Sequence, residues 1–214
     1  WGNYGRILSE YIFIKQFRKN KLNHFVTIKG SNILDEIKRN NEQVVFISGH
    51  FNNFELMAME IEKQGINLCA IYRPLNNIFL NGIMEQIRKK YICKHQIKKG
   101  KAGTRNLLNL FKQNFSVALM IDQRVSEGEN INFFNNMAKT TSIPAQLVKK
   151  YNCKIVPVYI ERKKNFHFQI FFHNPLKFDK ELSTQQISLE LNKILEKMIL
   201  KNPDQWIWSH DRWK

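Results

Sequence analysis

The sequence predicts an α/β fold in which a mostly parallel sheet is covered by helices on both faces, with one antiparallel hairpin in the C-terminal part. Short β-branched runs alternate along the chain with segments of helical periodicity, the pattern of strand–helix–strand units. Apolar residues make up 43% and charged residues 24% of the 214 residues, as in ordinary globular domains. No repeat or Gly/Pro-rich linker divides the chain, so we expect a single domain over residues 1–214.

The first residues form a basic amphipathic pattern. Apolar side chains recur at helical spacing, namely Ile7, Leu8, Tyr11, Ile12, Ile14 and Phe17. The positions between them include Arg6, Lys15, Arg18 and Lys19. A helix of this kind either packs on the domain or lies on a membrane surface, and the pattern leaves both open.

Short apolar runs predict the strands at 44–47, 68–72, 117–121, 155–161 and 166–172. The first run is continuous and β-branched, as expected of a strand buried on both faces. The last two are separated by the polar turn 162–165, so they form the one antiparallel hairpin that we expect.

Helical periodicity fills the segments between the strands, over 33–39, 53–65, 79–90, 104–113 and 183–201. Gly65 ends the second of these helices, and Ser183 and Thr184 can cap the last. A further helix is opened by Thr141 or Ser142. Residues 124–139 are expected to be a loop.

The chain is strongly basic, with 34 Lys and Arg against 18 Asp and Glu and a net charge of +16. Such a charge favours a polyanionic partner, which can be nucleic acid, anionic lipid headgroups or a phosphorylated substrate. The cations are scattered, apart from the cluster Lys98, Lys99 and Lys101, and RNA-binding signatures are absent from the sequence. The sequence therefore disfavours nucleic acid.

Cysteine usage and hydropathy indicate a cytosol-facing protein. Cys69, Cys93 and Cys153 lie far apart and predict three reduced thiols. No run approaches the ~18 to 20 apolar residues of a membrane span, and no signal peptide is evident. The chain begins with Trp1, which leaves open an N-terminal membrane anchor outside it.

Polar residues follow three of the predicted strands. In open α/β sheets, ligands bind beyond the carboxyl ends of the strands, where His50, Arg73 and Asp122 lie. Arg73 can grip a phosphate through its planar fork, or pair with Asp122 to tie two strand ends together. Lys98 and Lys99 either bind anions or form a solvated lysine run.

His50 and Glu55 form a candidate catalytic pair. The helix after His50 can bring the Glu55 carboxylate beside the imidazole, fixing its tautomer so that the other ring nitrogen acts as a general base. Taken alone, a histidine in a turn is more often a structural residue.

The segment Gly49-His50-Phe51-Asn52-Asn53-Phe54-Glu55 closely resembles the H-x4-D/E signature of the glycerolipid acyltransferase superfamily. Within that superfamily the sequence is most similar to the bacterial lipid A biosynthesis (late) acyltransferases, whose version commonly reads GHFGNWE. Further matches in family order are Tyr72-Arg73-Pro74, Asp122-Gln123, Phe133-Phe134-Asn135 and the closing Gln205-Trp206-Ile207-Trp208 with His210 and Arg212. Asn52 and Asn135 replace the usual glycines, which asparagine tolerates because it enters left-handed conformations cheaply.

The resemblance implies an acyltransferase with His50 and Glu55 as its catalytic dyad. The donor would be a thioester of acyl carrier protein or coenzyme A, and the acceptor a phosphorylated lipid A precursor, at the cytoplasmic face of the inner membrane. We expect Arg73, Lys99, Asp122 and Gln123 to bind substrate, and no metal or bound cofactor. Direct transfer is expected rather than an acyl-enzyme, since GxSxG is absent.

Two other functions stay open. One is an acyltransferase with the same dyad that acts on a lysophospholipid or another lipid hydroxyl. The other is a non-catalytic basic module that binds anionic lipid or nucleic acid, in which His50 would be dispensable. The closing tryptophans Trp206, Trp208 and Trp213 suit either a membrane interface or core packing.

Overall fold

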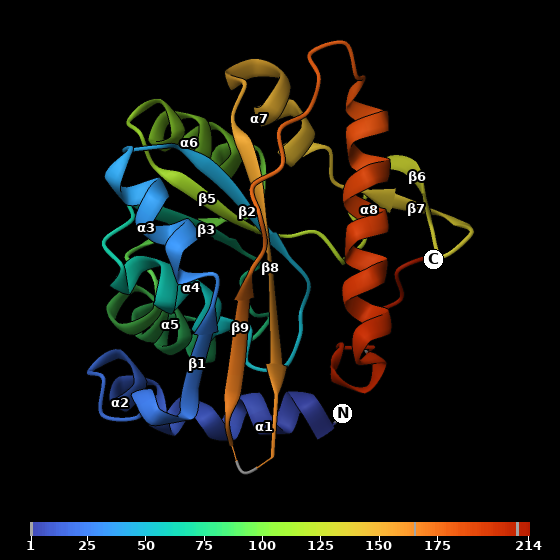
Figure 1. Cartoon of the computed structure of the whole chain (residues 1–214). Helices are drawn as coiled ribbons and strands as arrows, with labels where there is room; N and C mark the ends of the chain where they lie inside the picture. Colours follow the sequence, from blue (N-terminus) through green and yellow to red (C-terminus); the bar gives the residue numbers. More distant parts are fainter. Residues whose placement is uncertain (1, 165, 209) are drawn as a thin grey trace.

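The computed structural model describes residues 2–164, 166–208 and 210–214. Seven strands form a sheet in the order β1-β9-β8-β2-β5-β3-β4, and β6 and β7 pair separately (Figure 1). The strands are β1 Val26–Lys29, β2 Val44–Ser48, β3 Leu68–Tyr72, β4 His95–Lys98, β5 Ser116–Met120, β6 Glu129–Phe133, β7 Asn136–Thr140, β8 Lys154–Arg162 and β9 Phe168–Phe172. The predicted fold class is confirmed.

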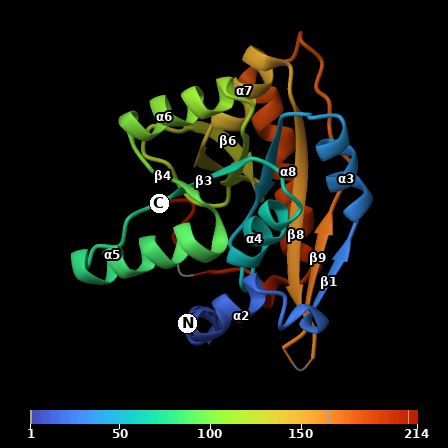
Figure 2. The same cartoon turned by 90° about the vertical axis from the view of Figure 1, so that its left-hand side faces the viewer.

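Helices α3 and α4 lie on one face of the sheet and α8 lies on the other (Figure 1, Figure 2). The α-helices are α1 Gly2–Glu10, α2 Ile14–Arg18, α3 Ser31–Arg39, α4 Glu55–Lys63, α5 Ile78–Ile87, α6 Lys101–Lys112, α7 Ile143–Tyr151 and α8 Thr184–Lys201. The shorter turns are η1 Tyr11–Phe13, η2 Asn23–Phe25, the π-helix η3 Arg88–Ile92 and η4 Pro203–Gln205. Ser183 caps α8 in a complete capping box with Gln186, as its sequence predicts.

The strands β8, β2, β5, β3 and β4 are parallel to one another, and β9 runs antiparallel to β8. The predicted hairpin is therefore confirmed, although Asn165 in its turn lies outside the described residues. Ser48 of β2 pairs with Met120 of β5, so the residues two positions beyond each strand end, His50 and Asp122, also come together. The sheet thus gathers the polar strand ends at one edge.

The segment predicted as a loop at 124–139 is instead largely a second antiparallel hairpin of β6 and β7. Its two turn residues, Phe134 and Asn135, have φ values of 50° and 59°, which is the two-residue geometry that suits hairpins. The prediction was wrong because a phenylalanine at the first turn position gives no turn signal. The short strands β1 and β4 were not predicted either.

The helix α1 lies near the end of β8 (Figure 1). Glu10, at the end of α1, is buried. Its Oε2 accepts a hydrogen bond from Asn53 Nδ2 at 2.9 Å, and its Oε1 lies 2.6 Å from Arg162 Nη2. Leu8 and Ile12 on the same segment are 55% and 73% exposed. One side of this amphipathic segment therefore packs on the domain, and the other side is exposed. Across the described ranges, no helix has both the length and the apolar character that crossing a membrane demands.

Candidate active site

The strand β2 runs into a tight turn that carries His50 and leads into α4. Asn52 in this turn has φ = 40°, a left-handed conformation that asparagine adopts more cheaply than most residues. The turn is held from the C-terminal segment, because Ile207 N donates to His50 O at 3.0 Å and Asn52 N donates to Gln205 O at 3.1 Å. The backbone around His50 is therefore fixed on both sides.

The imidazole of His50 is bound by Asp122. Its Nδ1 lies 2.7 Å from Asp122 Oδ1, while Asp122 Oδ2 accepts from His50 N at 2.8 Å and from Trp206 Nε1 at 2.9 Å. A carboxylate at Nδ1 places the ring proton there and leaves the lone pair on Nε2. Burial lowers the pKa of His50, but the Asp122 carboxylate outweighs it, and the pKa lies above its ordinary value.

Glu55 does not hold the His50 ring, contrary to the prediction. Its carboxylate accepts from Arg88 Nε and Nη2 at 2.8 and 2.6 Å, and from the Tyr11 hydroxyl. Glu55 is the first residue of α4 and binds side chains from η3 and η1, whereas the end of β5 brings Asp122 to the ring. Glu55 still lines the same cavity as His50 and adds to the field that raises its pKa.

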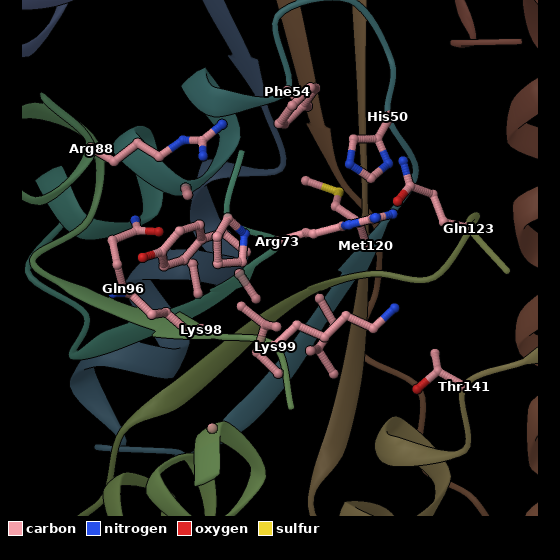
Figure 3. Close-up of a pocket in the computed structure, with 18 of the residues that line it drawn as sticks. His50, Phe54, Arg73, Arg88, Gln96, Lys98, Lys99, Met120, Gln123 and Thr141 are labelled. Atoms are coloured by element: carbon pink, nitrogen blue, oxygen red, sulfur yellow. The ribbon is translucent and has the colours of Figure 1, made fainter. Parts of the chain in front are cut away.

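A cavity of about 470 Å³ opens beside His50 at the ends of β5, β3 and β4 (Figure 3). Among the predicted substrate-binding residues, Arg73, Lys99 and Gln123 line it. Asp122 does not, because both of its oxygens are engaged by His50 and Trp206. These contacts make Asp122 the partner of His50, and its predicted role in binding substrate stays a prediction.

The rim of the cavity is cationic. Arg73 is exposed, and within the described part of the chain it forms no ion pair with Asp122, the alternative that the sequence allowed. Lys98 forms an ion pair with Glu85, with 3.4 Å between Nζ and Oε2. Lys99 lines the cavity and is exposed. The side chain of Lys101 lies outside the described residues. Arg73 and Lys99 are thus available to anionic groups that enter the cavity.

The inner wall of the cavity is apolar. It is formed by side chains of the sheet and of the elements around it, namely Ala58, Ala70, Ile71, Ile92, Ala118, Met120 and Ile143. Ala118 and Met120 belong to a central strand yet are only half-buried. The cavity accounts for this, because it lies over one face of β5 where a helix would otherwise pack.

Four residues of the site have no role that the sequence could assign. Arg88 and Tyr11 sit in helical segments without a motif, and their contacts with Glu55 depend on folding. Trp206 and His210 were noted in the closing motif, but their partners in the site were not foreseen. Trp206 is 3% exposed and packs in the core, whereas Trp208 is 57% exposed.

In the part of the chain that the structure describes, the site shows no group of metal ligands. Over the described residues, no three His, Cys, Asp or Glu side chains come together as a metal-binding group. The three cysteines are buried free thiols. Cys69 lies on β3, and Cys93 lies just before β4, the strand next to β3. The polar groups of the site are therefore those of an imidazole–carboxylate pair with cations around it.

The family model described as bacterial lipid A biosynthesis acyltransferase matches residues 1–214. A lipid A biosynthesis acyltransferase 2 of Shigella flexneri is 23% identical over 185 residues, covering 84% of this chain and 58% of that protein. A lipid A biosynthesis palmitoleoyltransferase of Escherichia coli (strain K12) is 26% identical over 192 residues, with 85% and 60% covered. A myristoyltransferase of the same pathway and organism is 22% identical, with 88% and 58% covered. The chain therefore spans about 58 to 60% of the length of these relatives.

Among solved structures, the chain resembles the 1-acyl-sn-glycerophosphate acyltransferase of Thermotoga maritima. The TM-score is 0.54 at 13% sequence identity, and the match covers 92% of this chain and 81% of that one. At this identity the likeness concerns the fold.

Proposed function

Because the chain belongs to the bacterial lipid A biosynthesis acyltransferase family, we propose that it transfers a fatty acyl chain from a thioester to a hydroxyl of a lipid A precursor. The donor is an acyl carrier protein or coenzyme A thioester. The observation that carries the proposal is the His50 ring, held at Nδ1 by Asp122 and bordering a cavity with an apolar wall and a cationic rim.

In this reaction His50 acts as the general base. An alcohol is a weak nucleophile at neutral pH, so Nε2 takes the hydroxyl proton as the oxygen attacks the thioester carbonyl. Asp122 holds the ring in the required tautomer and stabilises the imidazolium that forms. Backbone N–H groups at the start of α4 are suited to the developing oxyanion. The scheme involves no change of oxidation state and calls for no resident cofactor.

Glu55 serves the same site indirectly. It neutralises Arg88 at the cavity wall and adds negative charge near His50. Burial alone would lower the pKa of Arg88, but Glu55 and Tyr11 raise it, so the guanidinium stays charged. We therefore assign the catalytic pair as His50 and Asp122, with Glu55 and Arg88 as a supporting ion pair.

The cavity suits an acylated, phosphorylated substrate. Its apolar inner wall can hold hydrocarbon, while Arg73 and Lys99 at the rim suit phosphate oxygens of the acceptor or of the phosphopantetheine arm. Gln123 adds an uncharged polar group beside His50 (Figure 3).

We further propose that the chain acts at an anionic membrane surface, the cytoplasmic face of the inner membrane. Large apolar side chains are exposed on two segments that flank the cavity, including Ile12 at 73% on η1 and Ile78 and Phe79 at 76% and 81% on α5. Tyr4 and Leu75, near these segments, line the cavity and are themselves exposed. Such side chains together with a charge of +16 favour adsorption to anionic lipid.

Acyl transfer by the purified chain tests the function directly. Lauroyl, myristoyl and palmitoyl thioesters of acyl carrier protein and of coenzyme A are offered with a tetra-acylated lipid A precursor, and the product is analysed by mass spectrometry. We expect the mass to increase by one acyl chain, and the increase to be lost in His50→Ala but kept in His24→Ala. His24 is exposed and away from the cavity, which makes it a matched control.

Other results would point elsewhere. Transfer to a lysophospholipid in place of the lipid A precursor would keep the chemistry and change the acceptor. A mass increase that survives His50→Ala would contradict the proposed mechanism, and no transfer at all with binding to anionic vesicles intact would support a non-catalytic module.

A further inference from the structure

The C-terminal segment brings a second histidine to the cavity. His210 lines the same cavity as His50, Lys99 and Gln123. Its ring Nε2 accepts a hydrogen bond from the backbone N–H of Arg124 at 2.9 Å. Arg124 follows the Asp122-Gln123 pair, so the ring is anchored to the loop that also carries the partner of His50.

The anchoring bond fixes the tautomer of His210. A backbone N–H can only donate, so Nε2 must keep its lone pair, and the proton of the neutral ring is on Nδ1. Nδ1 is therefore a donor. Within the described part of the chain it has no hydrogen-bond partner.

The surroundings keep this ring uncharged at neutral pH. Burial lowers the pKa of His210, and His50, Arg212 and Lys99 act in the same direction, while Asp122 opposes them. The net pKa lies below the ordinary value for histidine. These influences also show that His210 lies within electrostatic reach of both members of the catalytic pair.

We propose that His210 donates a hydrogen bond from Nδ1–H to the thioester carbonyl oxygen during acyl transfer, an assignment that rests on the function proposed above. The hydroxyl oxygen of the lipid substrate attacks the thioester carbonyl carbon, and the hydroxyl proton passes to His50 Nε2. The C=O π electrons move onto the carbonyl oxygen. The intermediate then expels the thiolate as the C–S bond breaks, and the sulfur takes the proton from His50.

A neutral donor suits this oxygen in particular. The carbonyl oxygen is uncharged before the attack and negative after it, so a fixed neutral donor favours the transition state over the ground state. Phosphate groups carry permanent charge, and the exposed Arg73 and Lys99 are the matching groups for them. His210 therefore complements the cations of the rim rather than duplicating them.

Two substitutions separate a donor from a structural anchor. The amide nitrogen of asparagine can occupy the position of Nδ1, so His210→Asn keeps the donor and loses the acceptor for Arg124. The amide oxygen of glutamine can reach the position of Nε2, so His210→Gln keeps the anchor and loses the donor. His24→Asn is the matched control for a histidine outside the cavity.

We expect His210→Ala and His210→Gln to lower kcat by about 10²-fold with little change in KM, the magnitude typical of losing one oxyanion donor. His210→Asn should keep at least about tenfold more activity than His210→Gln. Glutamine more active than asparagine would overturn the proposal in favour of an anchor. Equal activity of all variants and wild type, or a loss that appears in KM alone, would overturn it as well.

NMR spectroscopy tests the assignment of His210 without requiring turnover. The ¹⁵N shifts of the histidine rings report the tautomer, and we expect His210 as the Nδ1–H form. An acyl-pantetheine analogue with a methylene in place of the thioester sulfur keeps the carbonyl and cannot react, and its binding should shift the His210 Nδ1 signal. An Nε2–H tautomer, or saturating binding without a shift, would overturn the assignment. A wild-type chain without transfer activity but with this shift would contradict the proposed function alone.

Discussion

Replacing Asp122 by asparagine tests the catalytic pair most sharply, because the structure dictates how the new amide must lie. Oδ2 of Asp122 accepts from two N–H donors, His50 N and Trp206 Nε1, and Oδ1 faces the ring. In Asp122→Asn the amide oxygen takes the place of Oδ2, and the amide NH₂ then faces His50 Nδ1. The ring must accept there, so its proton moves to Nε2 and the base is lost.

The size of the effect follows from the same contacts. For the ring to regain its active tautomer, the asparagine amide would have to turn its NH₂ group towards His50 N and Trp206 Nε1. Both N–H groups would then lack an acceptor, at a free-energy cost of about 1 to 3 kcal/mol each. The active tautomer is then disfavoured by roughly 2 to 6 kcal/mol, and each 1.4 kcal/mol corresponds to about a tenfold change, so the rate falls by roughly 30- to 10⁴-fold. The fold should survive, since the change conserves shape.

The assay is the initial rate of acyl transfer as a function of pH, with thermal unfolding to confirm the fold. Asp35→Asn serves as a control, because Asp35 is exposed on α3 and away from the cavity. Glu55→Gln should leave the His50 tautomer intact and so retain more activity than Asp122→Asn. If Asp122→Asn kept a rate within about threefold of wild type, the assignment of Asp122 as the partner of His50 would be refuted.

Three further outcomes are expected. Since neutral His50 is the active base and its pKa lies above the ordinary value, kcat/KM should rise with pH through a midpoint above about 6.5, as rates across pH would show. Glu55→Ala leaves the largely buried Arg88 unpaired and should lower the free energy of unfolding in urea by about 3 kcal/mol, with partial recovery when Arg88→Met is added. Gly30 has φ = 80°, and a Cβ added there would lie only 2.2 Å from Phe172 O, so Gly30→Ala should lower the free energy of unfolding by about 3 kcal/mol in the same assay. A Cβ added at Gly82 in α5 meets nothing within 4 Å, so Gly82→Ala should raise the free energy of unfolding by up to about 1 kcal/mol.

The sequence could predict those strands and helices whose pattern is local. The run 44–47 is apolar at every position, and Ser183 begins a helix with a complete capping box, so both elements were correctly placed. The strands β1 and β4 are short and half-exposed, and their periodicity is too brief to be distinguished from a loop. The hairpin of β6 and β7 was missed because its turn places Phe134, a residue without turn preference, at positive φ.

The site was predictable as a set of strand ends but not as a set of contacts. The rule for parallel sheets placed His50, Arg73 and Asp122 at one edge, where His50 and Arg73 line the cavity and Asp122 binds His50. Which carboxylate meets the ring depends on strand order, because β5 lies beside β2 and delivers Asp122. Sequence spacing favoured Glu55, which is nearer in the chain, and it carries no information on which strands are neighbours.

Gln205 and Ile207, which bind the His50 turn, also determine the order in which the site can be assembled. Asn52 is bound by Gln205, a residue 153 positions later, and the His50 carbonyl is bound by Ile207. During synthesis the turn emerges before Gln205, Ile207 and His210, all of which follow α8 in the sequence. The sheet can therefore be complete through β9 before the catalytic geometry exists, and a chain that stops at the end of α8 would have a fold without a working site.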